Sequence, residues 1–185
     1  MLVGRSKRTN CIANTSSSNL QRWNKMASSR LCTENITHNR MDTQLPDHLI
    51  ATLYKDLLLD WELNLKQKEL GWRYIKCKAA IDNEKIHLEV CPAKEVETRT
   101  RRLKRLINTN YIVCAEKRSI ARDALYHLRN SFAHAGVICI EHNNRRSELL
   151  FKSKINSVII MEARLHSSKL PAILRLLKLA APCDV

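Results

Sequence analysis

The sequence is poor in glycine, proline and aromatic residues, and these shortages limit the folds that it can adopt. Among 185 residues there are three glycines and four prolines, so few turns are forced, which favours long helices over a barrel of many strands. Aromatic residues make up 5% of the chain, against 44% for all hydrophobic residues. Leucine, isoleucine and valine must therefore fill most of a core that one domain of this length can build.

Several signatures of known site classes are also missing. Gly4, Gly71 and Gly136 stand alone, so there is no glycine-rich phosphate loop, which argues against a P-loop or dinucleotide enzyme. The seven cysteines include no Cys-x-x-Cys pair, which argues against a zinc ribbon. Free thiols fit a reducing compartment, so we expect a cytoplasmic protein. No apolar run approaches the ~20 residues of a membrane span, and we expect no membrane partner.

Acidic residues are scarce as well, above all at the start. The formal net charge is +14, and the first acidic residue is Glu34. Such an excess points to a polyanion such as nucleic acid as the partner. Residues 1–44 are rich in Ser, Asn and Thr, so we expect a disordered basic arm there and a folded domain over residues 45–181. An acid-free transit peptide and a later start at Met26 or Met41 remain open.

Hydrophobic periodicity predicts the elements of that domain. Apolar residues every four positions predict a helix over residues 46–69, with Leu49, Leu53, Leu57, Trp61 and Leu65 as its core face. Alternation predicts a β-hairpin over residues 74–91, and a helix through Lys76–Ala80 competes with its first arm. Helices are predicted over residues 93–109 and 114–135, a three-stranded antiparallel meander over residues 137–165, and a final helix after Pro171. The expected class is mainly α with a small antiparallel sheet (α+β).

The predicted helix 114–135 carries unusual polar residues. On a helical wheel, Ile120, Ala124, Leu125, Leu128 and Phe132 share a core face with their alanine neighbours. Asp123, His127, Asn130 and His134 fall together on the opposite side, with Arg129 on a flank of the core arc. A structural interpretation of Asp123 and His127 as a pair across one turn, and of His134 as a helix-end residue, stands beside a functional one.

The segment Leu128-Arg129-Asn130-Ser131-Phe132-Ala133-His134 resembles the signature of the HEPN superfamily, an arginine with an adjacent polar residue and a histidine on the last long helix of a bundle. The break at Ala135-Gly136, the strands that follow and the final helix are similar to a plasmid-encoded branch. The resemblance covers roughly residues 45–180, although its motif spans six positions. It implies a helical bundle with a C-terminal β-meander and a final helix, in a homodimer whose two motif helices face one shared cleft.

The resemblance also implies a chemistry. Many members of the superfamily cut RNA without a metal, because the ribose 2′-hydroxyl attacks its own phosphate. An imidazole with a pKa of ~6.5 suits the proton transfers, and a guanidinium suits the charged phosphorane. The resemblance therefore implies an acid/base role for His134, phosphate stabilisation by Arg129, and Asn130 as an orienting residue. No cofactor is expected, and the biological setting would be a toxin or an abortive-infection defence, with an antitoxin protein as a further partner.

Two other groups of side chains could form a binding site. The basic residues Arg99, Arg101, Arg102, Lys104 and Arg105 could grip an RNA backbone, or form a solvated face that is partly paired with Glu95 and Glu97. Asp123, His127 and His134 span three turns of helix, too far for one metal ion, so no metal site is expected. A metal-independent ribonuclease is the first hypothesis. A non-catalytic RNA- or protein-binding module is the second, and a DNA-binding adaptor is the third.

Overall fold

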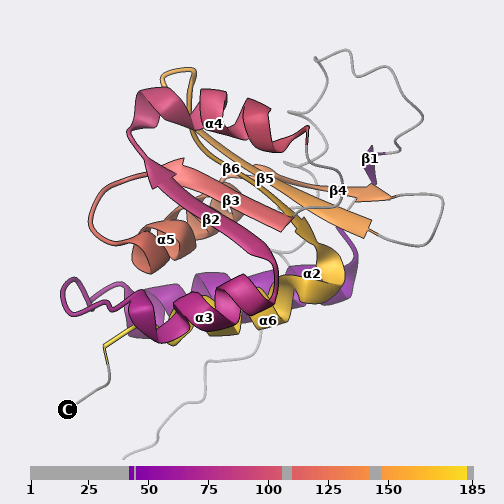
Figure 1. Cartoon of the computed structure of the whole chain (residues 1–185). Helices are drawn as coiled ribbons and strands as arrows, with labels where there is room; N and C mark the ends of the chain where they lie inside the picture. Colours follow the sequence, from indigo (N-terminus) through magenta and orange to yellow (C-terminus); the bar gives the residue numbers. More distant parts are fainter. Residues whose placement is uncertain (1–41, 44, 106–109, 142–146, 183–185) are drawn as a thin grey trace, which may run out of the picture. The chain divides into compact units, whose positions relative to one another are not determined.

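A six-stranded mixed sheet organises the described part of the chain. The computed structural model describes residues 42–43, 45–105, 110–141 and 147–182, all within the unit Ile36–Val185. The strands are ordered β1-β4-β5-β6-β3-β2 across the sheet (Figure 1). Their bounds are Asp42–Thr43 (β1), Ile86–Cys91 (β2), Asn110–Ala115 (β3), Val137–Glu141 (β4), Ser147–Ile155 (β5) and Val158–His166 (β6).

Helices on both faces of the sheet complete the unit. Their bounds are Asp47–Thr52 (α2), Leu53–Leu59 (η1), Trp61–Leu65 (η2), Ile75–Asn83 (α3), Ala93–Glu95 (η3), Val96–Leu103 (α4), Ile120–Ala133 (α5), Ser167–Lys169 (η4) and Leu170–Lys178 (α6). Within these described ranges, no helix combines the length and the apolar character that crossing a bilayer would require.

The predicted first helix is confirmed. The chain is helical without a break from Asp47 to Leu65, and η1 and η2 have the wider turns of a π-helix. The five residues of the predicted core face are all buried. The final helix is confirmed too: Pro171 lies in the first turn of α6, where its missing N–H costs no hydrogen bond.

The predicted hairpin over residues 74–91 is half wrong. Its second arm is β2, but its first arm is the helix α3, as the competing interpretation expected. Cys77 and Ile81, four residues apart, are buried, whereas Ile75 is 76% exposed. The apparent alternation in this segment therefore conceals a helical period. Lys85, with a φ of 56°, turns the chain from α3 into β2.

Strand β3 was missed by the sequence analysis. β2 and β3 are parallel, and a parallel pair needs a crossover connection, which contains η3 and α4. All six residues of β3 are buried, because α4 covers one face of the sheet at this strand and α5 covers the other. Such a strand is apolar throughout and shows no alternation. The helix predicted over residues 114–135 is therefore wrong from residue 114 to residue 119, where β3 ends and a loop follows, and is confirmed as α5 from Ile120 to Ala133. The helix predicted over residues 93–109 is confirmed from residue 93 to residue 103.

The three-stranded antiparallel meander is confirmed as β4, β5 and β6. The turn between β5 and β6 contains Asn156 and Ser157 with φ values of 48° and 67°, as a two-residue hairpin turn requires. Residues 142–146, between β4 and β5, lie outside the described residues.

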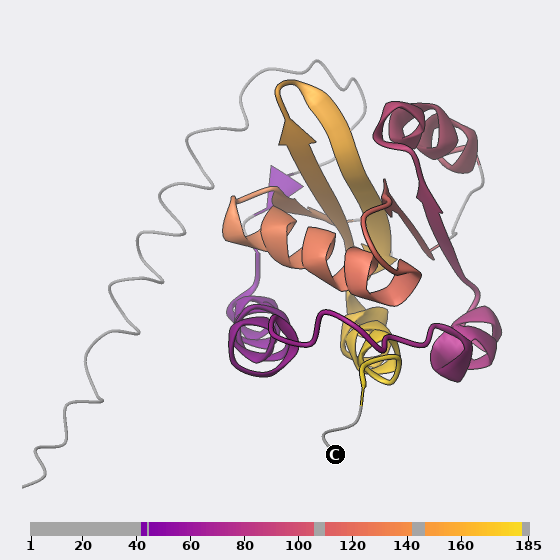
Figure 2. The same cartoon turned by 90° about the vertical axis from the view of Figure 1, so that its left-hand side faces the viewer.

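The core lies in layers around α5. Ile112 and Cys114 of β3 join the cluster that contains α5 and the helices beneath it, while Tyr111 and Val113 join Val96 and Leu103 of α4 in a second cluster. Figure 2 shows α5 between the sheet and a row of helices formed by the first helix, α6 and α3. Helix α4 covers the other face of the sheet.

The predicted fold class is right in being α+β and wrong in its architecture. A helical bundle with a small antiparallel sheet is contradicted by the six-stranded mixed sheet, on which the helices pack as separate layers. The error arose at two segments. Residues 75–83 form a helix whose sequence resembles a strand, and residues 110–115 form a strand whose end resembles part of a helix.

Candidate active site

Helix α5 is buried on nearly all sides, because it lies between the sheet and the helical layer. After its first residue, Tyr126, Arg129, Asn130 and Ala133 are the partly exposed residues of α5, and the exposed His134 follows them. With spacings of one, three and four, these five residues form one stripe along the helix, here called the α5 edge. All three predicted catalytic residues, Arg129, Asn130 and His134, therefore lie on the accessible side of an otherwise buried helix.

Two neighbours orient the guanidinium of Arg129. One Nη donates a hydrogen bond to Oδ1 of Asn130 at 2.9 Å, and the other forms an ion pair with Glu62 of η2. The side chain of Arg129 is 24% exposed. Each Nη carries a second N–H, so the group can still donate to an outside acceptor. The contact with Glu62 also ties α5 to the first helix beside the site.

Tyr126 belongs to the same network and was missed by the sequence analysis. The side chain of Asn130, and after it the charges of Lys117 and Arg129, lower the pKa of Tyr126. The ring packs against Trp61 at a centroid distance of 5.8 Å. A usable signal was present, because Tyr126, Asn130 and His134 are four residues apart and so share a helix face.

His134 ends α5 and is exposed to solvent. Its backbone N–H donates to the carbonyl of Asn130 at 3.0 Å. The chain then turns sharply through Ala135, which has a φ of 55°. At Gly136 a Cβ atom would meet the carbonyl oxygen of Lys152 at 2.1 Å, so the close approach of β5 requires glycine here. This turn fixes the direction in which α5 ends and therefore where the imidazole stands.

Asp123 and His127 lie in the core and not on the α5 edge. The expectation that they face away from the core is wrong. Both are completely buried. One carboxylate oxygen of Asp123 accepts hydrogen bonds from the backbone N–H groups of Lys117 and Arg118, each at 2.9 Å. Nε2 of His127 lies 3.1 Å from the carbonyl oxygen of Ala115. Burial lowers the pKa of His127 to about 4, so this imidazole is neutral and serves as a structural donor.

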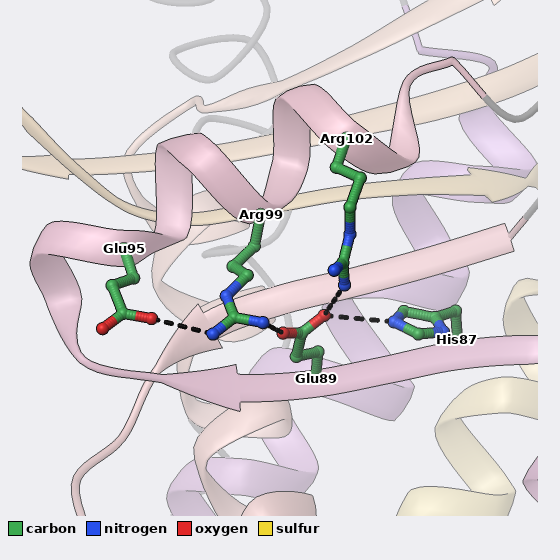
Figure 3. Close-up of polar contacts among 5 residues, drawn as sticks. All are labelled: His87, Glu89, Glu95, Arg99 and Arg102. Atoms are coloured by element: carbon green, nitrogen blue, oxygen red, sulfur yellow. Dashed lines mark hydrogen bonds and ion pairs between the residues drawn. The ribbon is translucent and has the colours of Figure 1, made fainter.

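The α4 cluster, defined as Arg99, Arg101, Arg102, Lys104 and Arg105, lies on the other face of the sheet. Figure 3 shows how densely part of it is paired: Glu89 of β2 contacts Arg99 at 3.1 Å, Arg102 at 3.6 Å and His87 at 3.2 Å. Arg99 also pairs with Glu95, Arg101 with Glu97, and Lys104 with the buried Glu162. Four of the five cations thus have acidic partners, which leaves much less net charge for an RNA backbone than the sequence suggested.

The described cysteines and acids offer no obvious metal centre. Cys77, Cys91, Cys114 and Cys139 are buried free thiols, and burial raises the pKa of Cys114 beyond the ordinary thiol range. Across the described ranges, no three His, Cys, Asp or Glu side chains gather closely enough to hold an ion.

Comparisons of the chain with protein families, with curated proteins and with solved structures find no match. What the α5 edge can do must therefore follow from its own side chains: an exposed imidazole, an oriented guanidinium, an amide and a phenol. Together they provide proton transfer and hydrogen-bond donors for an anion.

Proposed function

We propose that this chain is an endoribonuclease that cuts RNA without a metal, with His134 as the acid/base and Arg129 as the cation that stabilises the phosphate. The observation that carries the proposal is the α5 edge itself. α5 is buried elsewhere, and its accessible edge presents Arg129, Asn130 and His134, whose side chains suit such a reaction. The formal net charge of +14 supports a polyanionic substrate.

In the proposed reaction, a base removes the proton of a ribose 2′-hydroxyl, and the resulting oxygen attacks the adjacent phosphorus. The bond to the 5′-oxygen of the next nucleotide breaks, and that oxygen takes a proton from an acid. The products are a 2′,3′-cyclic phosphate and a free 5′-hydroxyl. An N–H of Arg129 would stabilise the charge on the phosphorane, and Asn130 would keep the guanidinium in place. The need for a 2′-hydroxyl makes the reaction specific for RNA.

We propose that the working site forms in a homodimer. Base and acid are two roles, and each chain brings one His134 to the α5 edge, so a second copy supplies the second imidazole. Leu59 and Leu63, on the helix that carries Glu62, are 40% and 66% exposed. A dimer would remove this apolar surface from water beside the site.

A non-catalytic RNA- or protein-binding module is the second candidate, and the ion pair between Glu62 and Arg129 favours a role without catalysis. A carboxylate next to the guanidinium competes with a phosphate for the same donors. The HEPN resemblance is common to both candidates, because it rests on the motif from Leu128 to His134 and not on the fold.

Digestion of single-stranded RNA in excess EDTA tests the proposal. We expect the full chain to cut, and Arg129→Ala and His134→Ala each to lower the rate by about a hundredfold or more, because general acid–base catalysis contributes about 10²–10⁴-fold. His48→Ala is the matched control, since His48 is an exposed histidine of α2, and it should cut like the parent. Absence of cutting by the parent, or full activity of His134→Ala, would overturn the ribonuclease proposal.

A further inference from the structure

The α5 edge extends beyond the three residues that the motif supplies. Lys117, in the loop before α5, is exposed, and its ammonium lies 4.3 Å from the centroid of the Tyr126 ring. Among the described residues it has no acidic partner within ion-pair distance, in contrast to four of the five cations in the α4 cluster. The Lys117 ammonium, which contacts the Tyr126 ring but no carboxylate, can therefore bind an anion from solvent.

The side chains around Lys117 form one polar group along the α5 edge. Asn130 and Lys117 both act on the Tyr126 hydroxyl, the ammonium of Lys117 lies over the Tyr126 ring, and Asn130 accepts a hydrogen bond from Arg129. Trp61 supports the tyrosine ring from the first helix. Lys117 and Arg129 thus lie on either side of the phenol and the amide. After the larger effect of Asn130, both cations lower the pKa of Tyr126, and both attract a phosphate.

We propose that Lys117 and Tyr126 form a second phosphate subsite, which binds the backbone of single-stranded RNA beside the nucleotide that is cut. Tyr126 and His134 are eight residues apart, which is about 12 Å along a helix at ~1.5 Å per residue. A stacked strand advances about 3.4 Å per nucleotide, so the subsite lies within about four nucleotides of His134. The assignment rests on the proposed function only in taking RNA as the ligand.

Binding to an RNA oligonucleotide that is fully 2′-O-methylated tests the subsite separately from cleavage, because this strand lacks the attacking hydroxyl. Followed by fluorescence anisotropy, Lys117→Ala and Tyr126→Phe should each weaken binding about three- to tenfold, and Lys117→Arg should restore it. The phenylalanine variant keeps the ring packing on Trp61. For Lys117→Ala, the slope of log affinity against log salt should fall by about 0.7, the contribution of one phosphate contact to a single strand.

Matched controls come from other elements. Lys94→Ala in η3 and Tyr74→Phe, just before α3, remove the same groups elsewhere in the fold and should bind like the parent. With cleavable RNA at saturation, Lys117→Ala should cut within twofold of the parent rate, whereas His134→Ala should bind normally and not cut. If the two subsite variants bind like the parent, or if the controls lose as much affinity, the subsite is refuted. A parent that binds but never cuts would refute the ribonuclease proposal and leave the binding test intact.

Discussion

His127 and His134 differ in burial, although a spacing of seven residues places them on the same side of a helix. His127 is completely buried and its pKa is lowered from 6.5 to about 4, by burial first and by the charge of Lys117 second, while His134 is exposed. A helical wheel assigned both to one polar face, because a wheel assumes one core face per helix. α5 has two, one toward the sheet and one toward the helical layer, so its open side is narrower than the sequence indicates.

The buried His127 predicts a pH dependence of stability. In the folded chain it stays neutral down to a pH of about 4, whereas in the unfolded chain it takes up a proton near 6.5. Between these values the unfolded state binds more protons, so the free energy of unfolding should fall as the pH drops from 6.5 to 4, by up to about 3 kcal/mol. Urea denaturation across this range, with His127→Gln as the comparison, measures the effect. Equal pH dependence in both proteins would contradict it.

At the scale of elements, the sequence predicted best those helices and strands that have one buried face. The first helix, β4, β5 and α6 each bury one side, so their periodicity identified them. β3 is buried on both sides and α3 is short, with two fully buried residues, so periodicity misread both. Among the site residues, the motif led to Arg129, Asn130 and His134. Tyr126 could have been found from its spacing of four residues from Asn130, whereas Glu62 required a tertiary contact, since it is 67 residues from its partner.

The ion pairs between Glu89 and the α4 cluster lead to a prediction about stability. Glu89 is 19% exposed and contacts two arginines and His87, so Glu89→Gln would leave Arg99 and Arg102 facing each other without the carboxylate. We expect a loss of about 1–2 kcal/mol in the free energy of unfolding at low salt. Glu97→Gln is the control, because Glu97 is 53% exposed and pairs with Arg101 alone, and it should change stability by less than about 0.5 kcal/mol. Denaturant melts compare the two; similar losses would show that the network around Glu89 adds nothing.

At the scale of the whole molecule, the proposed homodimer accounts for the apolar surface next to the site. Leu63→Lys should shift the protein from dimer to monomer in light-scattering measurements and lower the cleavage rate, since a charge would enter the interface. Ile75→Lys is the matched control, because Ile75 is 76% exposed on α3. A parent protein that is monomeric at all concentrations, or a Leu63→Lys variant that stays dimeric and active, would exclude this interface.

The central claim is that the α5 edge directs a ribose hydroxyl onto its own phosphate. The most direct measurement uses one RNA strand in excess EDTA, first unmodified to locate the cut and then with a single 2′-deoxy nucleotide at that position. The account predicts a 2′,3′-cyclic phosphate at the cut in the unmodified strand and complete protection of the same bond in the modified one. Cleavage at the deoxy position, or product ends without a cyclic phosphate or its 2′- or 3′-phosphate hydrolysis products, would contradict it.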